Sequence, residues 1–289
     1  MERMLKRNNW LICIDLDGTF LKEPKEGIAH FEDIHEGNVK VIKELKEKGH
    51  EIAIITGRPW RDTKVIYETL GLETVIGNFN GSYIHNPTDK GFVPVQTTLN
   101  RYLVKKMIRD MIPRDLYENA IVELLEDTYV INKEDDMFFN FFHIDGDMGL
   151  KIIETAEDIK QNPLAVTIKL KLKHDDAINL VQKLKRYYGH AFALRIWNYE
   201  EKDISLLEIN HKSVSKANAM KQIASYYNIP VSRTISFGDG TNDIEMLAEA
   251  AHGVAMKNAS NFVKAFGNDT TDLDNTDGGV GDYLNKYFR

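Results

Sequence analysis

The chain of 289 residues is 43% hydrophobic and 28% charged with 7 prolines, so it can bury one large or two medium cores and has little room for a disordered tail. Its 37 basic residues are scattered among 44 acidic ones, for a formal net charge of −7, which argues against the continuous basic stripe that nucleic-acid binding requires. No apolar run approaches the roughly 20 residues that cross a bilayer, and residues 1–9 lack an apolar signal core, so we expect a cytoplasmic protein with neither nucleic acid nor a membrane as partner.

The first eighty residues alternate short apolar runs with helical patterns, as parallel strands joined by crossover helices do. Residues 10–14 and 51–55 are predicted to be buried strands, with a helix between them that ends at Gly49. A second helix is predicted over residues 60–70. Cys13, the single cysteine, lies in the first apolar run, which excludes an intrachain disulfide and predicts a buried thiol.

The same alternation returns near the C-terminal end of the chain. Helices and strands are predicted there in turn, over residues 215–227, 234–237, from about 243, and 253–256. We expect these elements and those of the first eighty residues to form one parallel sheet of the α/β class.

The middle of the chain follows a different pattern. Residues 166–172 alternate as a half-buried strand, residues 174–188 have helical spacing, and residues 192–197 form another predicted strand. We therefore expect an inserted α+β domain over about residues 83–198.

Two carboxylates directly follow the first predicted strand. Successive side chains of extended backbone alternate, so Asp15 and Asp17 project to the same side, and Gly18 allows the chain to leave the sheet. The carboxyl ends of parallel strands are where open α/β sheets bind ligands. A solvated acidic turn is the alternative for this motif taken by itself.

The second predicted strand ends in Thr56, Gly57 and Arg58, which offer a hydroxyl and backbone N–H groups to an anion. Taken by itself, Thr56 could instead be a helix N-cap.

Lys216 lies at the start of a predicted helix, where its charge opposes the helix dipole. This unfavourable placement indicates an anionic partner nearby, although a solvent-facing lysine is the default interpretation.

The strand over residues 234–237 runs into a glycine-rich turn that carries Asp239, Asn242 and Asp243. Oxygen ligands from this turn, together with Asp15 and Asp17, suit a hard cation such as Mg²⁺. Helix capping by one of the two turn aspartates is compatible with metal binding.

In this order the segments resemble the four motifs of the haloacid dehalogenase superfamily, and specifically of its Cof-type phosphatases. The matching segments are Asp15–Thr19, Thr56–Arg58, Val214–Lys216 and Gly238–Asp243, and Asn80–Gly81 and Gly253–Asn258 look like two further signatures of the family. The resemblance implies a Rossmann-like, doubly wound core over residues 1–82 and 199–289, with a cap domain over residues 83–198.

The resemblance also implies a Mg²⁺-dependent phosphatase. Asp15 would attack phosphorus, and Asp17 would protonate the leaving oxygen and later deprotonate water. Asp15, Asp239 and the backbone carbonyl of Asp17 would hold the metal, whereas Asp243 would hold its waters or orient Lys216.

The residues implied to bind the phosphate are Thr56, Gly57, Lys216 and Asn242. The expected substrate is a small phosphorylated metabolite, either a sugar phosphate or a phosphorylated cofactor. A phosphomutase or phosphotransferase of related architecture, and a non-catalytic regulator that binds a sugar phosphate, are the alternatives.

Overall fold

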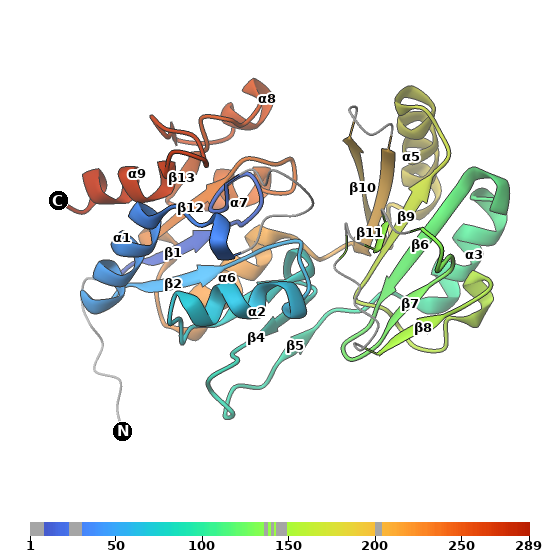
Figure 1. The fold of residues 1–289 in the computed structure, drawn as a ribbon, viewed down its shortest axis with the longest axis horizontal. Coiled ribbons are helices and arrows are strands. Elements are labelled where there is room, and N and C mark those ends of the chain that lie inside the picture. Colours follow the sequence, from blue (N-terminus) through green and yellow to red (C-terminus); the bar gives the residue numbers. More distant parts are fainter. Residues whose placement is uncertain (1–8, 23–30, 136–137, 140–141, 143–148, 200–203) are drawn as a thin grey trace. The chain divides into compact units, whose positions relative to one another are not determined.

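The computed structural model describes residues 9–22, 31–135, 138, 139, 142, 149–199 and 204–289 (Figure 1). The chain divides into a core unit, Met1–Val95 with Ser215–Arg289, and an inserted unit, Gln96–Val214. Both ends of the chain thus build one unit, and the middle is an insertion.

The core unit contains a five-stranded sheet in the order β14-β13-β12-β1-β2. Its strands are β1 (Leu11–Ile14), β2 (Glu51–Ile54), β12 (Thr234–Gly238), β13 (His252–Ala255) and β14 (Asp269–Thr270). Every neighbouring pair is parallel, and Ile14 is in register with both Phe237 and Ile54. The carboxyl ends of β1, β2 and β12 are therefore level, which brings the segments that follow them together.

Helices cover both faces of this sheet (Figure 1). They are α1 (Glu36–Glu47), α2 (Trp60–Thr69), α6 (Lys216–Tyr226), α7 (Ile244–Glu249), α8 (Asn261–Lys264) and α9 (Gly279–Tyr287). Side chains of β1 alternate between the faces: Ile12 and Ile14 share a core with α1 and α9, whereas Leu11 and Cys13 share one with α6 and α7. The predicted doubly wound α/β core is confirmed, and its predicted elements lie within two residues of the observed ones.

A second, three-stranded sheet is formed by β3 (Ile76–Asn78) and β4 (Tyr83–His85) of the core unit and by β5 (Val95–Gln96), which includes the last residue of this part of the core unit. Between β3 and β4 the chain makes one 3₁₀ turn, Phe79–Gly81. Because β4 pairs with β3, residues 83–95 group with the core unit, whereas the sequence had led us to expect them in the insertion.

The inserted unit is a six-stranded sheet in the order β10-β11-β9-β6-β7-β8, antiparallel except for the β7–β8 pair. Its strands are β6 (Tyr117–Glu123), β7 (Thr128–Val130), β8 (Leu150–Ile152), β9 (Ala165–Leu170), β10 (Phe192–Tyr199) and β11 (Ile204–His211). Helices α3 (Arg101–Met111) and α5 (His174–Tyr188) share one apolar core with this sheet. Since β11 pairs with β9 and β10, residues 199–214 group with the insertion, whereas the expected boundary was at residue 198.

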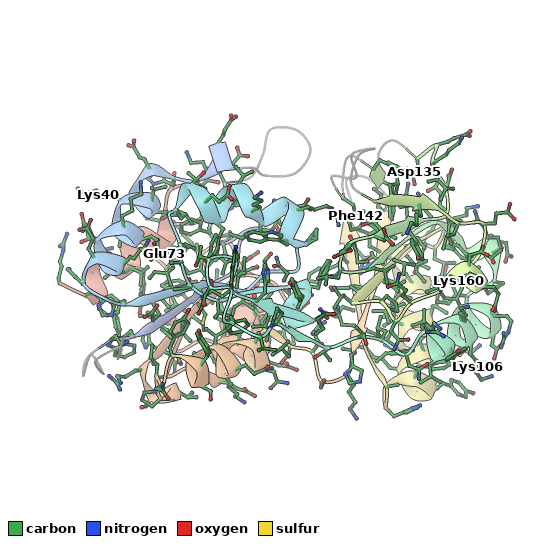
Figure 2. The ribbon with its side chains drawn as sticks, turned by 90° about the horizontal axis from the view of Figure 1, so that it is seen from below. Lys40, Glu73, Lys106, Asp135, Phe142 and Lys160 are labelled. Carbon is green, nitrogen blue, oxygen red and sulfur yellow. The ribbon has the colours of Figure 1, made fainter. Side chains whose placement is uncertain are left out.

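Short 3₁₀ turns complete the described elements: Phe31–Asp33, Arg114–Leu116, Ala156–Asp158 and Val231–Arg233. Charged side chains such as Lys40 and Lys106 lie at the surface of their units (Figure 2). Among the helices of the described ranges, none is both long and apolar enough to cross a membrane.

Candidate active site

Three carboxylates come together where β1 and β12 end. Asp15 follows β1, and Asp239 and Asp243 follow β12. One oxygen atom from each lies within 4.8 Å of the others. Residues more than 220 positions apart thus meet because the two strands are neighbours in register.

Asp15 is 5% exposed, and its carboxylate Oδ1 lies 2.7 Å from the Lys216 Nζ. Its backbone N–H donates to the carbonyl of Phe237, which ties the residue to the end of β12. Burial raises the pKa of Asp15 well above its usual value, the charge of Asp243 raises it further, and Lys216 opposes both. The site therefore concentrates negative charge that a cation would relieve.

Asp239 approaches the first motif closely because residue 18 is a glycine. The Thr19 hydroxyl donates to Asp239 Oδ1 at 2.7 Å. Gly18 has φ +68°, and a Cβ there would lie 2.2 Å from Asp239 Oδ2. Burial, followed by the charge of Asp243, raises the pKa of Asp239 to about 7.

Asp243 is fully buried and both of its carboxylate oxygens are used by the protein. Oδ1 accepts from the Lys216 Nζ at 2.7 Å, and Oδ2 accepts from the backbone N–H groups of Asp239 (3.1 Å) and Gly240 (2.8 Å). Although Asp243 is the N-cap residue of α7, its side chain does not cap that helix. It instead holds the turn and the lysine in place.

Lys216 is fully buried between two carboxylates, so the anionic partner expected from its position at the start of α6 is present. Burial lowers its pKa, but Asp15 and Asp243 together raise the pKa above its usual value, so the ammonium stays charged. The solvent-facing alternative is wrong for this lysine.

Removal of Lys216 should be costly because two buried carboxylates lose their counter-charge. We expect Lys216→Ala to lower the free energy of unfolding by about 3–5 kcal/mol, measured by urea denaturation in metal-free buffer. Lys221→Ala on the same helix is the matched control, since the Lys221 pair with Glu249 is exposed and worth about 0–1 kcal/mol. Equal losses in the two variants would contradict a structural role for the buried lysine.

The carboxylate of Asp17 is placed apart from the three-carboxylate cluster. It is 53% exposed and forms a two-point ion pair with Arg58, whose Nε lies 2.8 Å from Asp17 Oδ2 and whose Nη2 contacts Oδ1. The Arg58 side chain is 7% exposed, and its remaining Nη1 is buried without a hydrogen-bond partner among the described residues. The sequence predicts an anion contact only for the backbone of Arg58, and the ion pair of its side chain was not predicted.

Hydrogen bonds from Asn78 hold the loop that carries Arg58. Asn78 Nδ2 donates to the Arg58 carbonyl and to the Thr63 hydroxyl, each at 3.0 Å. The amide orientation of Asn78 is thereby fixed, so its Oδ1 accepts from His85 Nε2 at 3.0 Å. Burial lowers the pKa of His85 to about 4, which keeps this ring neutral at pH 7.

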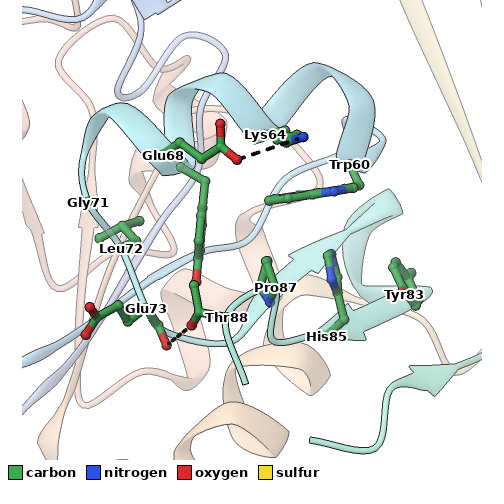
Figure 3. A pocket seen from close by; sticks show the side chains of 11 residues that line it. Trp60, Lys64, Glu68, Gly71, Leu72, Glu73, Tyr83, His85, Pro87 and Thr88 are labelled. Atoms are coloured by element: carbon green, nitrogen blue, oxygen red, sulfur yellow. Dashed lines mark hydrogen bonds and ion pairs between the residues drawn. The ribbon is translucent and has the colours of Figure 1, made fainter. Parts of the chain in front are cut away.

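A pocket of about 650 Å³ lies between α2 and β4 (Figure 3). Trp60, Tyr83 and His85 line one part of it, and Tyr83 stacks on His85 with ring centroids 4.3 Å apart. Asp15 and Lys216 are not among the residues that line it. The carboxylate cluster, and not this pocket, marks the candidate active site.

The residues predicted to bind phosphate end up around the same strand ends. Thr56 is fully buried, and its hydroxyl accepts from the Arg58 N–H, so it shapes the loop and does not cap α2. Gly57 is exposed and lies next to the Asn80 amide, which also accepts a hydrogen bond from Asn242 Nδ2 at 2.9 Å. Asn80 was recognised as part of a signature but was not assigned to the site.

The donor set fits a hard divalent cation. Asp15 and Asp239 supply carboxylate oxygens, the ligands that Mg²⁺ prefers. Burial, followed by the charge of Asp243, raises the pKa of both, and a bound cation would favour their ionised forms. Asp243 belongs to the cluster, but its oxygens already accept from Lys216 and the turn. We therefore regard Asp15 and Asp239 as the carboxylates best able to hold a metal.

Comparison with known proteins identifies the family of the chain. The family model of the haloacid dehalogenase-like hydrolases matches residues 12–284. The 5-amino-6-(5-phospho-D-ribitylamino)uracil phosphatase YitU of Bacillus subtilis (strain 168) is 32% identical over 279 residues, which cover 96% of this chain and 97% of the relative. The pyridoxal phosphate phosphatase YbhA of Escherichia coli (strain K12) is 25% identical over 279 residues, with coverage of 91% and 94%.

A solved sugar phosphatase of haloacid dehalogenase subclass IIB has the same fold, with a TM-score of 0.75 at 20% identity and coverage of 97% of this chain and 99% of that one. The family match spans nearly the whole chain, and the carboxylates after β1 and β12 meet Lys216 in one site. The chain therefore belongs to the haloacid dehalogenase-like hydrolases, as a phosphatase of their Cof-type group.

Proposed function

We propose that this phosphatase hydrolyses a small phosphorylated metabolite, a sugar phosphate or a phosphorylated cofactor, with Mg²⁺ and through an aspartyl-phosphate on Asp15. The observation that carries the proposal is the buried Asp15 carboxylate, fixed at one oxygen by Lys216 and adjacent to Asp239. A carboxylate held in this way is oriented as a nucleophile.

In the first step an oxygen of Asp15 forms a bond to phosphorus while the bond from phosphorus to the leaving oxygen breaks. Lys216 offsets the charge on the phosphoryl oxygens and keeps Asp15 in place. The Thr56–Gly57 loop and Asn242 position the phosphoryl group. These roles are positioning and charge stabilisation, which are the main requirements of phosphoryl transfer.

Asp17 is the proposed general acid and base. It gives a proton to the leaving oxygen in the first step and takes one from water in the second, when water attacks phosphorus and frees Asp15. Its carboxylate is half exposed and paired with Arg58. We propose that the ion pair with Arg58 is the resting arrangement of Asp17 and that Asp17 leaves this pair when it transfers a proton.

Asp15, Asp239 and the backbone carbonyl of Asp17 are the proposed holders of Mg²⁺, and Asp243 orients Lys216 and the turn. When bound, the ion neutralises charge on the phosphoryl group and polarises its oxygens. The chain's own contribution is to keep the oxygen ligands in place through Thr19, Lys216 and the backbone of the turn.

Support for a small phosphorylated metabolite comes from two relatives, one named for 5-amino-6-(5-phospho-D-ribitylamino)uracil and one for pyridoxal phosphate. The fold alone does not choose the substrate.

The test is a screen of the purified protein against phosphorylated sugars, vitamins and nucleotide cofactors, with orthophosphate release measured in Mg²⁺ and in chelator. We expect release from at least one ester, its loss in chelator, and its return on addition of Mg²⁺. Full activity without metal would refute the proposed metal site. An isomeric phosphate ester as product, without free phosphate, would identify a mutase instead.

A further inference from the structure

The Phe79–Gly81 turn has a backbone conformation that its sequence does not favour. Three successive residues have positive φ: Phe79 at 51°, Asn80 at 57° and Gly81 at 98°. Glycine and asparagine tolerate this region, but a bulky phenylalanine adopts it only with backbone strain. Strain of this kind persists where the surrounding structure enforces it.

The surrounding contacts are those of the phosphate-binding segments. The Phe79 N–H donates to the Arg58 carbonyl at 3.2 Å, and the Asn80 N–H donates to the Thr56 carbonyl at 2.8 Å. On its other side the turn is pressed against α6, since a Cβ on Gly81 would lie 2.9 Å from the Ala219 Cβ. The turn is thus packed between the second motif and α6, the helix that begins with Lys216.

The left-handed backbone directs the Asn80 side chain into this site. The residue is 1% exposed, and its Oδ1 accepts from Asn242 Nδ2 at 2.9 Å. Its amide oxygen and nitrogen lie 3.6 and 3.7 Å from the position that a Cβ of Gly57 would take. Asn80 therefore lies between the second and fourth motifs, whose strands β2 and β12 are separated in the sheet by β1.

The Asn242 amide is oriented by its hydrogen bond to Asn80, to which its nitrogen donates. Its oxygen lies so close to Gly240 that a Cβ on that residue would be 2.6 Å away, and the glycine therefore leaves room for the amide. An amide that the protein already orients loses less side-chain freedom when a ligand binds.

We infer that Asn80 is a positioning residue for phosphate binding: it holds the Asn242 amide in the orientation that receives the phosphoryl group. This inference rests on the proposed phosphatase function and on the proposed phosphate contact of Asn242. It adds to the site a residue that acts through another side chain.

Asn80→Gly removes the side-chain amide but keeps the left-handed backbone, because glycine adopts that conformation without strain. The variant therefore tests the amide alone. Asn228→Gly is the matched control: Asn228 has φ 54°, is exposed, and lies beyond the end of α6. For Asn80→Gly we expect kcat/KM to fall about 10- to 100-fold, with higher values of KM and of the inhibition constant of orthophosphate. The Mg²⁺ concentration for half-maximal activity should not change, and Asn228→Gly should resemble the parent protein in all four quantities.

A double-mutant cycle with Asn242→Ala tests whether Asn80 acts through Asn242. The inference requires that Asn242→Ala reduce kcat/KM and that adding Asn80→Gly to it cause no further loss. Three results would overturn the inference. They are additive losses of kcat/KM in the double variant, an unchanged kcat/KM in Asn242→Ala, and an Asn80→Gly protein that does not fold while Asn228→Gly does. If the parent protein hydrolyses no phosphate ester, the proposed function is wrong. If the parent protein is active and Asn80→Gly has the same kcat/KM, only the inference about Asn80 is wrong.

Discussion

The Asp15→Asn protein should form no phosphoenzyme with any substrate, and its kcat should fall by at least about 10⁴-fold, in line with the loss of a nucleophile in other covalent catalysts. The amide that replaces the carboxylate cannot form the phosphoryl bond. The variant should still fold, because Lys216 keeps its contact with Asp243. Intact-mass measurement after rapid acid quench, with para-nitrophenyl phosphate as substrate, would show an added phosphate on the parent protein and none on the variant.

The matched control for this variant is Asp33→Asn, which changes a carboxylate of the core unit outside the described cluster. It should retain the parent rate. A nitrophenol burst from Asp15→Asn equal to that of the parent would place the nucleophile elsewhere.

The Asp17→Asn protein should release one equivalent of nitrophenol in a burst and then stall. Nitrophenol is an acidic leaving group that needs little protonation, so phosphate can still move to Asp15. Attack of water on the aspartyl-phosphate lacks its base, and the steady rate should fall by about 10²- to 10⁴-fold. Phosphate should accumulate on the protein in an acid-stable form that hydroxylamine removes.

A substrate with a poorly acidic alcohol as leaving group supplies the internal comparison for Asp17→Asn. With that substrate the first step also needs the missing acid, so the burst itself should disappear. Steady turnover at the parent rate with either ester would show that Asp17 is not the acid and base.

The placement of the candidate site at the strand ends could be predicted from the sequence because its signals are local. Asp15 and Asp17 directly follow a short apolar strand, and the same is true of Asp239 after β12, so the pattern of strand and carboxylate specifies both the element and the position of the side chain. Lys216 was also informative, since a lysine at the start of a helix implies an anion nearby, and two carboxylates are present.

The contacts that complete the site are not local. The ion pair of Arg58 with Asp17 spans 41 positions, and the bond of Asn80 with Asn242 spans 162. The second depends on a left-handed phenylalanine, which local propensity disfavours, so tertiary contacts decide the conformation of that turn.

The boundaries between the units were displaced for a related reason. A segment belongs to the unit whose strands it pairs with. The hydrophobic periodicity of a single strand does not show its partner, so the pairing of β4 with β3 and that of β11 with β9 could not be predicted. Each predicted boundary therefore fell 13 to 16 residues before the observed one.

The reactivity of Cys13 can report how often the central sheet of this protein opens. It is the single thiol in the chain, it is fully buried in β1 between β12 and β2, and burial raises its pKa. A thiol-reactive dye can therefore label the native protein only when the central sheet separates. The labelling rate in water, compared with that of the unfolded chain, measures the free energy of that opening without any substitution. Cys13 is two residues from Asp15, so a phosphate analogue bound at the site should slow the labelling of Cys13. The same measurement would then report binding at the site.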